Sequence, residues 1–151
     1  MLSSWNETLE FCPILSSLRA HASLMVEMVE SGICGTADTS VTVLGEKLKE
    51  VAKCGRLICY AEAAVLIGIS ISSAQGRRSL AKILKEVCGS EIRSGRPMLG
   101  SLVVRKDTGM PGTGFFREAI VLGNFAGGSE EDNRSFWSAE VKRVYQYWSG
   151  K

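Results

Sequence analysis

One stretch limits the possible folds of this chain more than any other, namely Gly95–Phe116. It reads GRPMLGSLVVRKDTGMPGTGFF. Its apolar run, Leu102–Val104, is too short for a helix and is bounded by loop-forming residues. Lys106–Gly109 offers turn chemistry, because an Asp side chain can bond to the backbone and Gly readily adopts a positive φ. The stretch therefore predicts a loop, a short buried strand, a tight polar turn and a Gly-Pro loop.

Two helical segments joined by a turn come before this stretch. Ala61–Ile67 is helical by composition, Gly68–Ser73 interrupts it, and a second helix is expected over Gln75–Val87. One face of that second helix is apolar, and the other carries cations. The apolar positions are Leu80, Ile83, Leu84 and Val87. A helix-turn-helix followed by a strand and a turn predicts a winged-helix-like core with a short β-wing, although a basic amphipathic helix is equally typical of an ordinary protein surface.

The remaining segments predict a mostly α (α+β) protein with additional helices at both ends. Helices are expected within Trp5–Glu30, over Val41–Lys53 and over Arg117–Leu122, with Gly35–Ser40 as a linker. Ser135 is the expected N-cap of the last helix. A chain of 151 residues suits a single domain. Its expected parts are a helical region over 1–35, a winged-helix-like core over 41–123 and a closing helix over 135–149.

Composition excludes several classes of protein. The net charge of +2 is too small for a histone-like protein. Five cysteines without a CxxC pair, and a single histidine, His21, offer no zinc-site spacing. Without a charged-then-apolar leader, reduced thiols in a cytoplasm are the simplest expectation. The apolar run Leu57–Ala74 contains Glu62 and barely reaches the length of a membrane span, so a buried core segment is favoured.

We find no residue pattern that predicts catalysis, and none that requires a cofactor or metal. Glu140-Val141-Lys142 matches the Glu-x-Lys end of a metal-dependent nuclease motif. On a helix, however, residues two apart do not face each other, whereas that motif needs a strand. Cys54, between Lys53 and Arg56, has cationic neighbours that favour a thiolate, but no second histidine is present to serve it.

Two family resemblances arise from these motifs. Tyr60-Ala61-Glu62-Ala63-Ala64, a basic helix, Arg96-Pro97 and an apolar strand together resemble the DNA-binding domain of O6-alkylguanine alkyltransferases and alkyltransferase-like proteins. Met98 stands where that family has its acceptor cysteine, so the resemblance implies winged-helix DNA binding without alkyl transfer. The stretch Gly95–Phe116, with the final aromatic helix, is also similar to an uncharacterised family of bacterial and phage-type proteins, which implies no particular activity.

The sequence thus predicts a cytoplasmic, non-catalytic winged-helix protein that binds double-stranded nucleic acid. The predicted binding residues are Arg77, Arg78, Lys82, Lys85, Arg96, Arg105 and Lys106. For Arg96 the sequence leaves two roles open, a structural anchor and a contact to a bound anion. For Asp107 it leaves open whether the side chain only holds the turn or also has a functional role. The alternative function is a protein-interaction module or accessory subunit, of phage or mobile-element origin, with a protein partner or self-association and no membrane.

Overall fold

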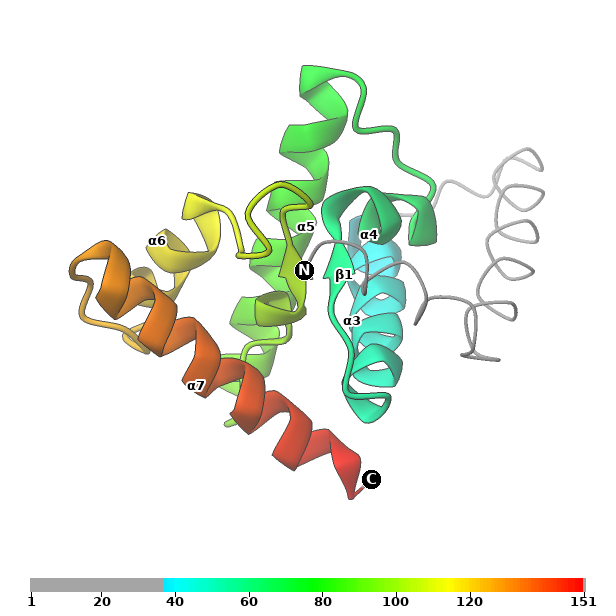
Figure 1. The fold of residues 1–151 in the computed structure, drawn as a ribbon. Coiled ribbons are helices and arrows are strands. Elements are labelled where there is room, and N and C mark those ends of the chain that lie inside the picture. The colour runs from blue at the N-terminus through cyan, green and yellow to red at the C-terminus, as the bar shows by residue number, and fades with distance from the viewer. Residues whose placement is uncertain (1–36, 151) are drawn as a thin grey trace. The chain divides into compact units, whose positions relative to one another are not determined.

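The structure, a computed structural model, describes residues 37–150; the helical region predicted for 1–35 lies outside them. The chain divides into two units, Met1–Cys34 and Gly35–Lys151. In its described residues the second unit has five α-helices, a short 3-10 helix and a two-stranded parallel sheet (Figure 1). The expected α-rich fold class is therefore confirmed. Within 37–150, no helix combines the length and the apolar character that a bilayer crossing requires.

Helix α3 spans Ala37–Lys53 and supplies one wall of the core. Leu44 and Leu48 are fully buried, as their helical spacing predicts. Gly55 follows with a φ of 63°, the conformation expected just past a helix end. Part of the linker expected over Gly35–Ser40 is helical instead, because α3 begins at Ala37. Asp38 in its first turn favours this earlier start, since a carboxylate is stabilised at a helix N-terminus.

The sheet joins two segments that are far apart in the sequence. Strand β1, Ile58–Cys59, pairs in parallel with β2, Val103–Val104. A 3-10 helix, η1, covers Leu99–Leu102 and leads directly into β2. All its residues are buried, and α3, α5 and α7 all contact it. Residues 98–104 of the predicted organising stretch are all buried, although Leu102, expected in the strand, instead ends the 3-10 helix.

Two helices connect the strands. Helix α4 spans Tyr60–Leu66 and α5 spans Ala74–Arg93. The four apolar residues predicted to share the inner face of α5 are all buried. The expected end at Val87 was wrong by six residues. The helix continues through Gly89, which lies buried within α5, where its missing side chain leaves room for the guanidinium of Arg93.

The last two helices begin earlier than predicted. Helix α6 spans Thr113–Val121 and α7 spans Glu130–Ser149. Ser135 was the wrong N-cap. The side chain of Ser129 accepts a hydrogen bond from the Asp132 backbone N–H, and the Asp132 carboxylate accepts one from the backbone N–H of Ser129. This reciprocal capping box starts the helix six residues upstream of Ser135.

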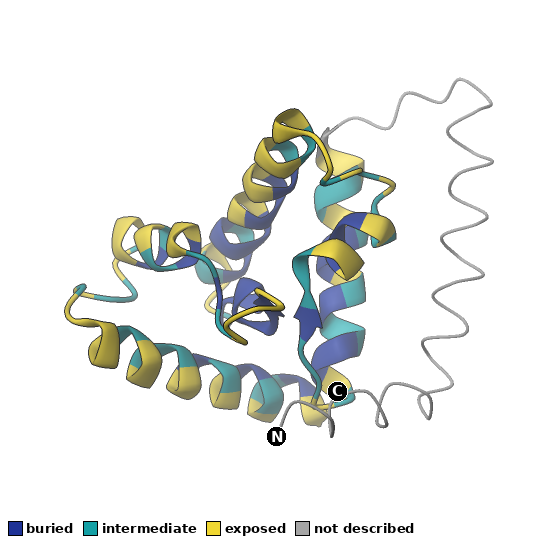
Figure 2. Cartoon of the chain, turned by 45° about the horizontal axis from the view of Figure 1, so that its top comes forward, coloured by how far each residue is buried: buried dark blue, intermediate teal, exposed yellow. Residues whose placement is uncertain are grey.

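Two hydrophobic clusters stabilise this unit. The larger one gathers the inner faces of α3, α4 and α5 with η1, β2 and the end of α7, including Val144 and Trp148. The smaller one is built around Cys88, Met98 and Phe115 and includes stacked phenylalanine rings between α6 and α7. Figure 2 shows the resulting pattern, in which α5 and α7 each turn a buried side inward and an exposed side outward.

Candidate nucleic-acid interface

The turn between α4 and α5 is held tightly against the start of α5. A Cβ at Gly76 would stand 1.7 Å from the carbonyl oxygen of Ser70, so only glycine allows this approach. The guanidinium of Arg77 donates hydrogen bonds to the carbonyls of Ile71 and Ser72, at 2.9 and 3.2 Å. Ser73 caps the helix by accepting from the Gly76 N–H at 3.0 Å. These contacts fix the direction in which α5 leaves the turn.

Cations occupy the outward side of α5. Arg78, Lys82 and Lys85 stand at i, i+4 and i+7, which places them on one face of a helix. All three are exposed, and they lie opposite the buried apolar stripe. Residues 63–85 contain no acidic residue, so nothing in this segment opposes the positive charge. The outward face of α5 is therefore locally positive, although the protein as a whole has little net charge.

The loop that follows β2 carries two further cations. Arg105 and Lys106 are both exposed. Arg105 forms an ion pair with Asp107, its Nη2 lying 2.6 Å from Oδ2. The pKa of the Asp107 carboxyl is held below its usual value, chiefly by this hydrogen bond from Arg105. The loop's exit is fixed by the Tyr60 hydroxyl, which accepts a hydrogen bond from the Gly112 N–H at 3.0 Å. The loop is thereby tied to α4.

The seven cations predicted to bind nucleic acid fall into two groups by their contacts. Within residues 37–150, three of them make no side-chain hydrogen bond or ion pair, namely Arg78, Lys82 and Lys106. The other four contact the protein itself, namely Arg77, Lys85, Arg96 and Arg105. Lys85 pairs with Glu118 of α6 at 3.2 Å. The free donors are therefore concentrated on α5 and on the loop after β2.

Arg96 lies away from the basic half of α5, just beyond the helix's other end. Its Nε and Nη2 donate to both carboxylate oxygens of Glu91, which is 4% exposed. The Glu91 hydrogen bond is the main cause of the raised pKa of the Arg96 guanidinium. Arg96 thus neutralises a buried carboxylate, and this contact gives Arg96 a structural role. Asp107 likewise has a structural contact, because its Oδ1 accepts the Thr108 N–H at 2.9 Å.

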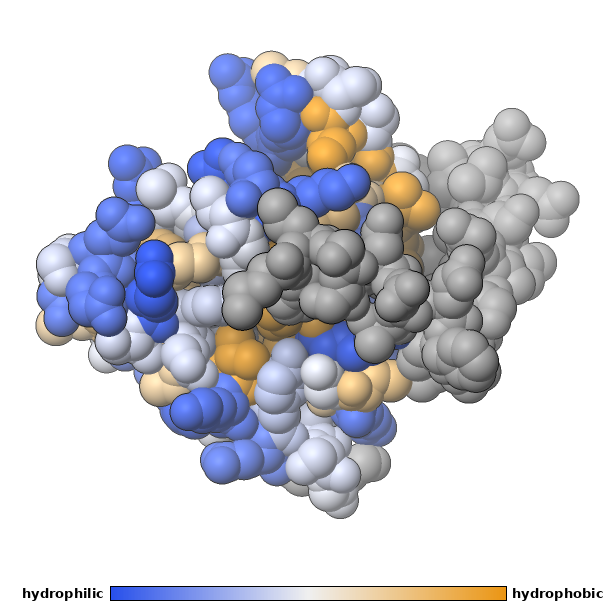
Figure 3. All heavy atoms as spheres, viewed as in Figure 1, coloured by the Kyte–Doolittle hydropathy of each residue, from blue (hydrophilic) through white to orange (hydrophobic). Residues whose placement is uncertain are grey.

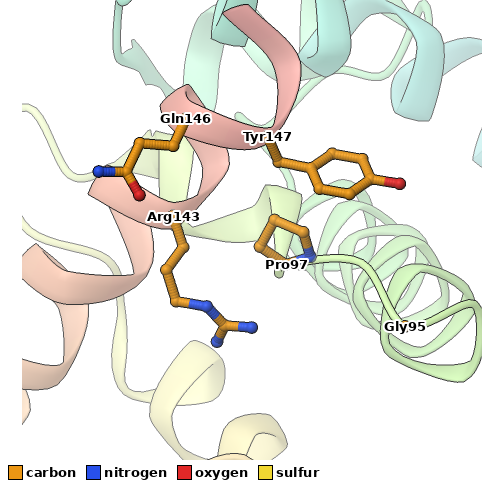
Figure 4. Close-up of a pocket in the computed structure, with 5 residues that line it drawn as sticks. All are labelled: Gly95, Pro97, Arg143, Gln146 and Tyr147. Atoms are coloured by element: carbon orange, nitrogen blue, oxygen red, sulfur yellow. The ribbon is translucent and has the colours of Figure 1, made fainter. Parts of the chain in front are cut away.

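A shallow hollow lies between α7 and the segment that follows α5. It encloses about 330 Å³ and is lined by Gly95, Pro97, Arg143, Gln146 and Tyr147 (Figure 4). The Arg143 guanidinium donates to the carboxylate of Glu140 at 2.8 Å, and Glu140 is 1% exposed. The positive charge at the hollow is therefore already compensated by a buried carboxylate, which leaves little to attract an anion.

The structure offers little support for chemistry at the residues considered for catalysis. Glu140, from the nuclease-like tripeptide, accepts the Met98 backbone N–H at 2.7 Å in addition to Arg143, whereas Lys142 is exposed to solvent. Burial raises the pKa of the Cys88 thiol to about 12, which keeps it protonated. Across residues 37–150 no group of three or more potential metal ligands is found. His21 lies outside the described residues.

Two residues that hold the α4–α5 turn and the loop after β2 in place were not predicted from the sequence. Gly76 allows the turn to approach α5 closely because it has no side chain, and the Tyr60 hydroxyl links α4 to Gly112 by a hydrogen bond. A glycine three residues after Ser73 in an otherwise helical segment was a usable signal, since such a glycine often marks a tight backbone contact. No local signal predicts the Tyr60 contact, because its partner lies 52 residues away in sequence.

On the surface, hydrophilic side chains gather over the first turns of α5 and over the same face around the loop after β2 (Figure 3). The first turns of α5 also extend beyond the neighbouring helices α3 and α4 (Figure 1). Comparison with protein-family models, with curated proteins and with solved structures finds no match to this chain.

Proposed function

We propose that this protein binds double-stranded DNA without catalysis, using α4 and α5 as a helix–turn–helix and the loop after β2 as a short wing. The first half of α5 lies in or along a groove. Arg78 and Lys82 contact phosphates or base edges there, while Lys106 contacts the backbone of the neighbouring strand. Docking of a second helix into the groove, with the first crossing the backbone, is the general mode of such motifs.

The observation that carries this proposal is the uncompensated charge of α5. Within the described residues, Arg78 and Lys82 form no ion pair, and the first acidic residue of α5 is Glu86, one turn beyond Lys82. Cations that stabilise a fold generally sit beside carboxylates, as Arg96 and Arg143 do here. Unpaired cations on a projecting helix instead resemble the electrostatic footprint of a phosphate-binding surface. The exposed hydroxyls of Ser70 and Ser72 bond to each other at 2.8 Å, which leaves one O–H of the pair to donate to a phosphate oxygen.

The proposal is tested by reversing the charge on α5. Binding of the whole chain to a fluorescent DNA duplex is measured by anisotropy over a range of salt concentrations. Arg78→Glu/Lys82→Glu should weaken binding by at least about tenfold at low salt, because two phosphate contacts are lost. The slope of log affinity against log salt should also become shallower by roughly 2, at about 0.9 per contact.

A matched control carries the same change of charge on another helix. Arg134 and Lys142 are exposed on α7 and make no ion pair within the described residues. Arg134→Glu/Lys142→Glu should leave duplex binding nearly unchanged apart from weak long-range effects. If the α5 variant binds as the unmodified protein does, or if both double variants weaken binding equally, α5 is not the binding surface and the proposal fails.

A second candidate function, a protein-interaction module, is favoured by a different surface. Ile120 and Val121 on α6 are 46% and 74% exposed, although large apolar side chains are usually covered. A protein partner or a second copy of the chain would bury them. Val121→Lys should then abolish a complex or self-association that gel filtration detects for the unmodified protein, without changing DNA binding. A monomeric elution of both forms, with no co-eluting protein, would reject this candidate.

A further inference from the structure

The loop after β2 is built to hold its shape. The Arg105 N–H donates to the Met110 carbonyl, and the Gly109 N–H donates back to the Arg105 carbonyl, both at 2.8 Å. Gly109 has a φ of 67°, which closes the turn. Thr108 contributes a further backbone contact, since its N–H donates to Asp107. The Arg105 backbone is thus fixed at the base of a small closed loop.

The Arg105 side chain is fixed as well. Its Nε lies 3.1 Å from Asp107 Oδ1, and its Nη2 lies 2.6 Å from Oδ2. The carboxylate therefore accepts two hydrogen bonds from one edge of the planar guanidinium. This fork uses two of the five N–H donors of an arginine. The opposite edge, formed by Nη1 and the second hydrogen of Nη2, bonds to none of the described residues. Both side chains are more than half exposed, so the pair lies at the protein surface.

Neither stability nor plain phosphate binding accounts well for this fork. An exposed ion pair contributes on average little to stability. For phosphate binding, the carboxylate is a disadvantage, because Asp107 places a negative charge where a phosphate would approach. A base edge carries no net charge, so Asp107 repels it less strongly than it would repel a phosphate. The fork holds the guanidinium plane in one orientation. A defined orientation matters most when the guanidinium donates to two acceptors at the same time.

We propose that Arg105, oriented by Asp107, reads a guanine by donating from Nη1 and Nη2 to its O6 and N7. This inference rests on the DNA-binding function proposed above and gives that surface its sequence preference. Guanine presents two acceptors side by side in the major groove, and adenine, thymine and cytosine do not. Lys106, adjacent and unpaired within the described residues, contacts the phosphate backbone and carries no preference. Tyr60, through Gly112, fixes the distance between this loop and α4.

The test compares sequence preference with affinity. The unmodified protein first selects from a random duplex pool, and the enriched site is then remade with single base changes. Replacing the guanine read by Arg105 should weaken binding about 5- to 150-fold, the range for one bidentate base contact. Arg105→Ala should bind all of these duplexes alike at that position. Lys106→Ala should keep the preference but lower affinity for every duplex.

Two further comparisons separate base reading from phosphate contact. A duplex with 7-deazaguanine at the selected position lacks the N7 acceptor, so it should weaken binding of the unmodified protein and leave Arg105→Ala unaffected. Asp107→Asn should reduce the guanine preference while affinity for other sites stays equal or rises, because a negative charge is removed. A structural role for Asp107 would lower affinity for all duplexes together.

Three results would overturn the inference. Selection without any preferred guanine would do so while leaving the proposed DNA binding intact. An Arg105→Ala variant that weakens all duplexes by the same factor would make Arg105 a phosphate contact. An unmodified protein that binds no duplex even at low salt would reject the proposed function itself, and the guanine contact with it.

Discussion

Gly76 lacks a side chain at the point where the turn from α4 meets α5. The carbonyl oxygen of Ser70 occupies the space that any Cβ would need. Gly45 differs, although it is also helical: a Cβ there would stand 4.0 Å from Val87, an ordinary contact distance. The same added methyl group would therefore clash with backbone at Gly76 and make an ordinary packing contact at Gly45.

We expect Gly76→Ala to lower the free energy of unfolding by about 2 kcal/mol or more, because the turn must move away from α5. Gly45→Ala should raise it by about 0.5–1 kcal/mol, since alanine loses less backbone entropy in a helix. Urea unfolding monitored by circular dichroism measures both changes. Shifts of the same sign in the two variants would contradict the contact at Ser70.

At the scale of elements, α7 shows how a helix start depends on its cap. The capping box of Ser129 and Asp132 satisfies backbone donors that would otherwise be exposed at the first turn. The pKa of the Asp132 carboxyl lies below its usual value, first because of the Ser129 side-chain hydrogen bond. Three acidic residues in this turn also interact favourably with the helix dipole. Residues 130–134, which precede the predicted N-cap Ser135, are therefore helical.

We expect Ser129→Ala to lower the free energy of unfolding by about 1 kcal/mol, the usual effect of losing an N-cap. Ser135→Ala should be neutral or slightly stabilising, because Ser135 lies exposed within α7, where alanine is the better helix former. Denaturant midpoints of the two variants provide the comparison. A larger loss at Ser135 than at Ser129 would place the helix start where the sequence pattern alone suggested it.

At the scale of the whole unit, α7 fastens the two hydrophobic clusters to the central η1 segment. Trp137 Nε1 donates to the Ser101 carbonyl at 2.8 Å, and the buried Glu140 accepts the Met98 N–H. Cys88 lies in the smaller cluster at 3% exposure, against Gly100, where a Cβ would stand 2.5 Å from its sulfur. Its thiol can therefore ionise only when this packing opens.

This burial predicts a loss of stability in mild alkali. Burial raises the pKa of Cys88 from 9.0 to about 12, so the unfolded chain releases this proton at lower pH than the folded one. The unfolded state then binds fewer protons, and stability falls as pH rises from about 9 towards 12, by about 1.4 kcal/mol per pH unit. Cys88→Ala should be less stable overall but should lack this part of the slope. Parallel stability curves for the two proteins between pH 8 and 10 would contradict it.

Much of the fold was predictable wherever the signal is local. The apolar stripe of α5 predicted which of its residues are buried, and Leu44 and Leu48 did the same for α3. Gly109 adopts the positive φ expected of it. The helix ends were predicted less well, because α5 continues six residues beyond Val87 and the Ser129–Asp132 capping box was overlooked. The candidate cations were predictable as residues, but not which of them would already be paired.

By itself, the sequence determined the helical periodicities, the glycine turns and the acid-free basic segment of residues 63–85, since each depends on neighbours only a few positions apart. The tertiary structure alone decided the parallel pairing of Ile58 with Val103, the Tyr60–Gly112 hydrogen bond and the Glu140–Met98 contact. These join residues more than 40 positions apart, and no local propensity specifies such a meeting. It arises only when whole helices pack around a shared core and bury their polar groups in pairs.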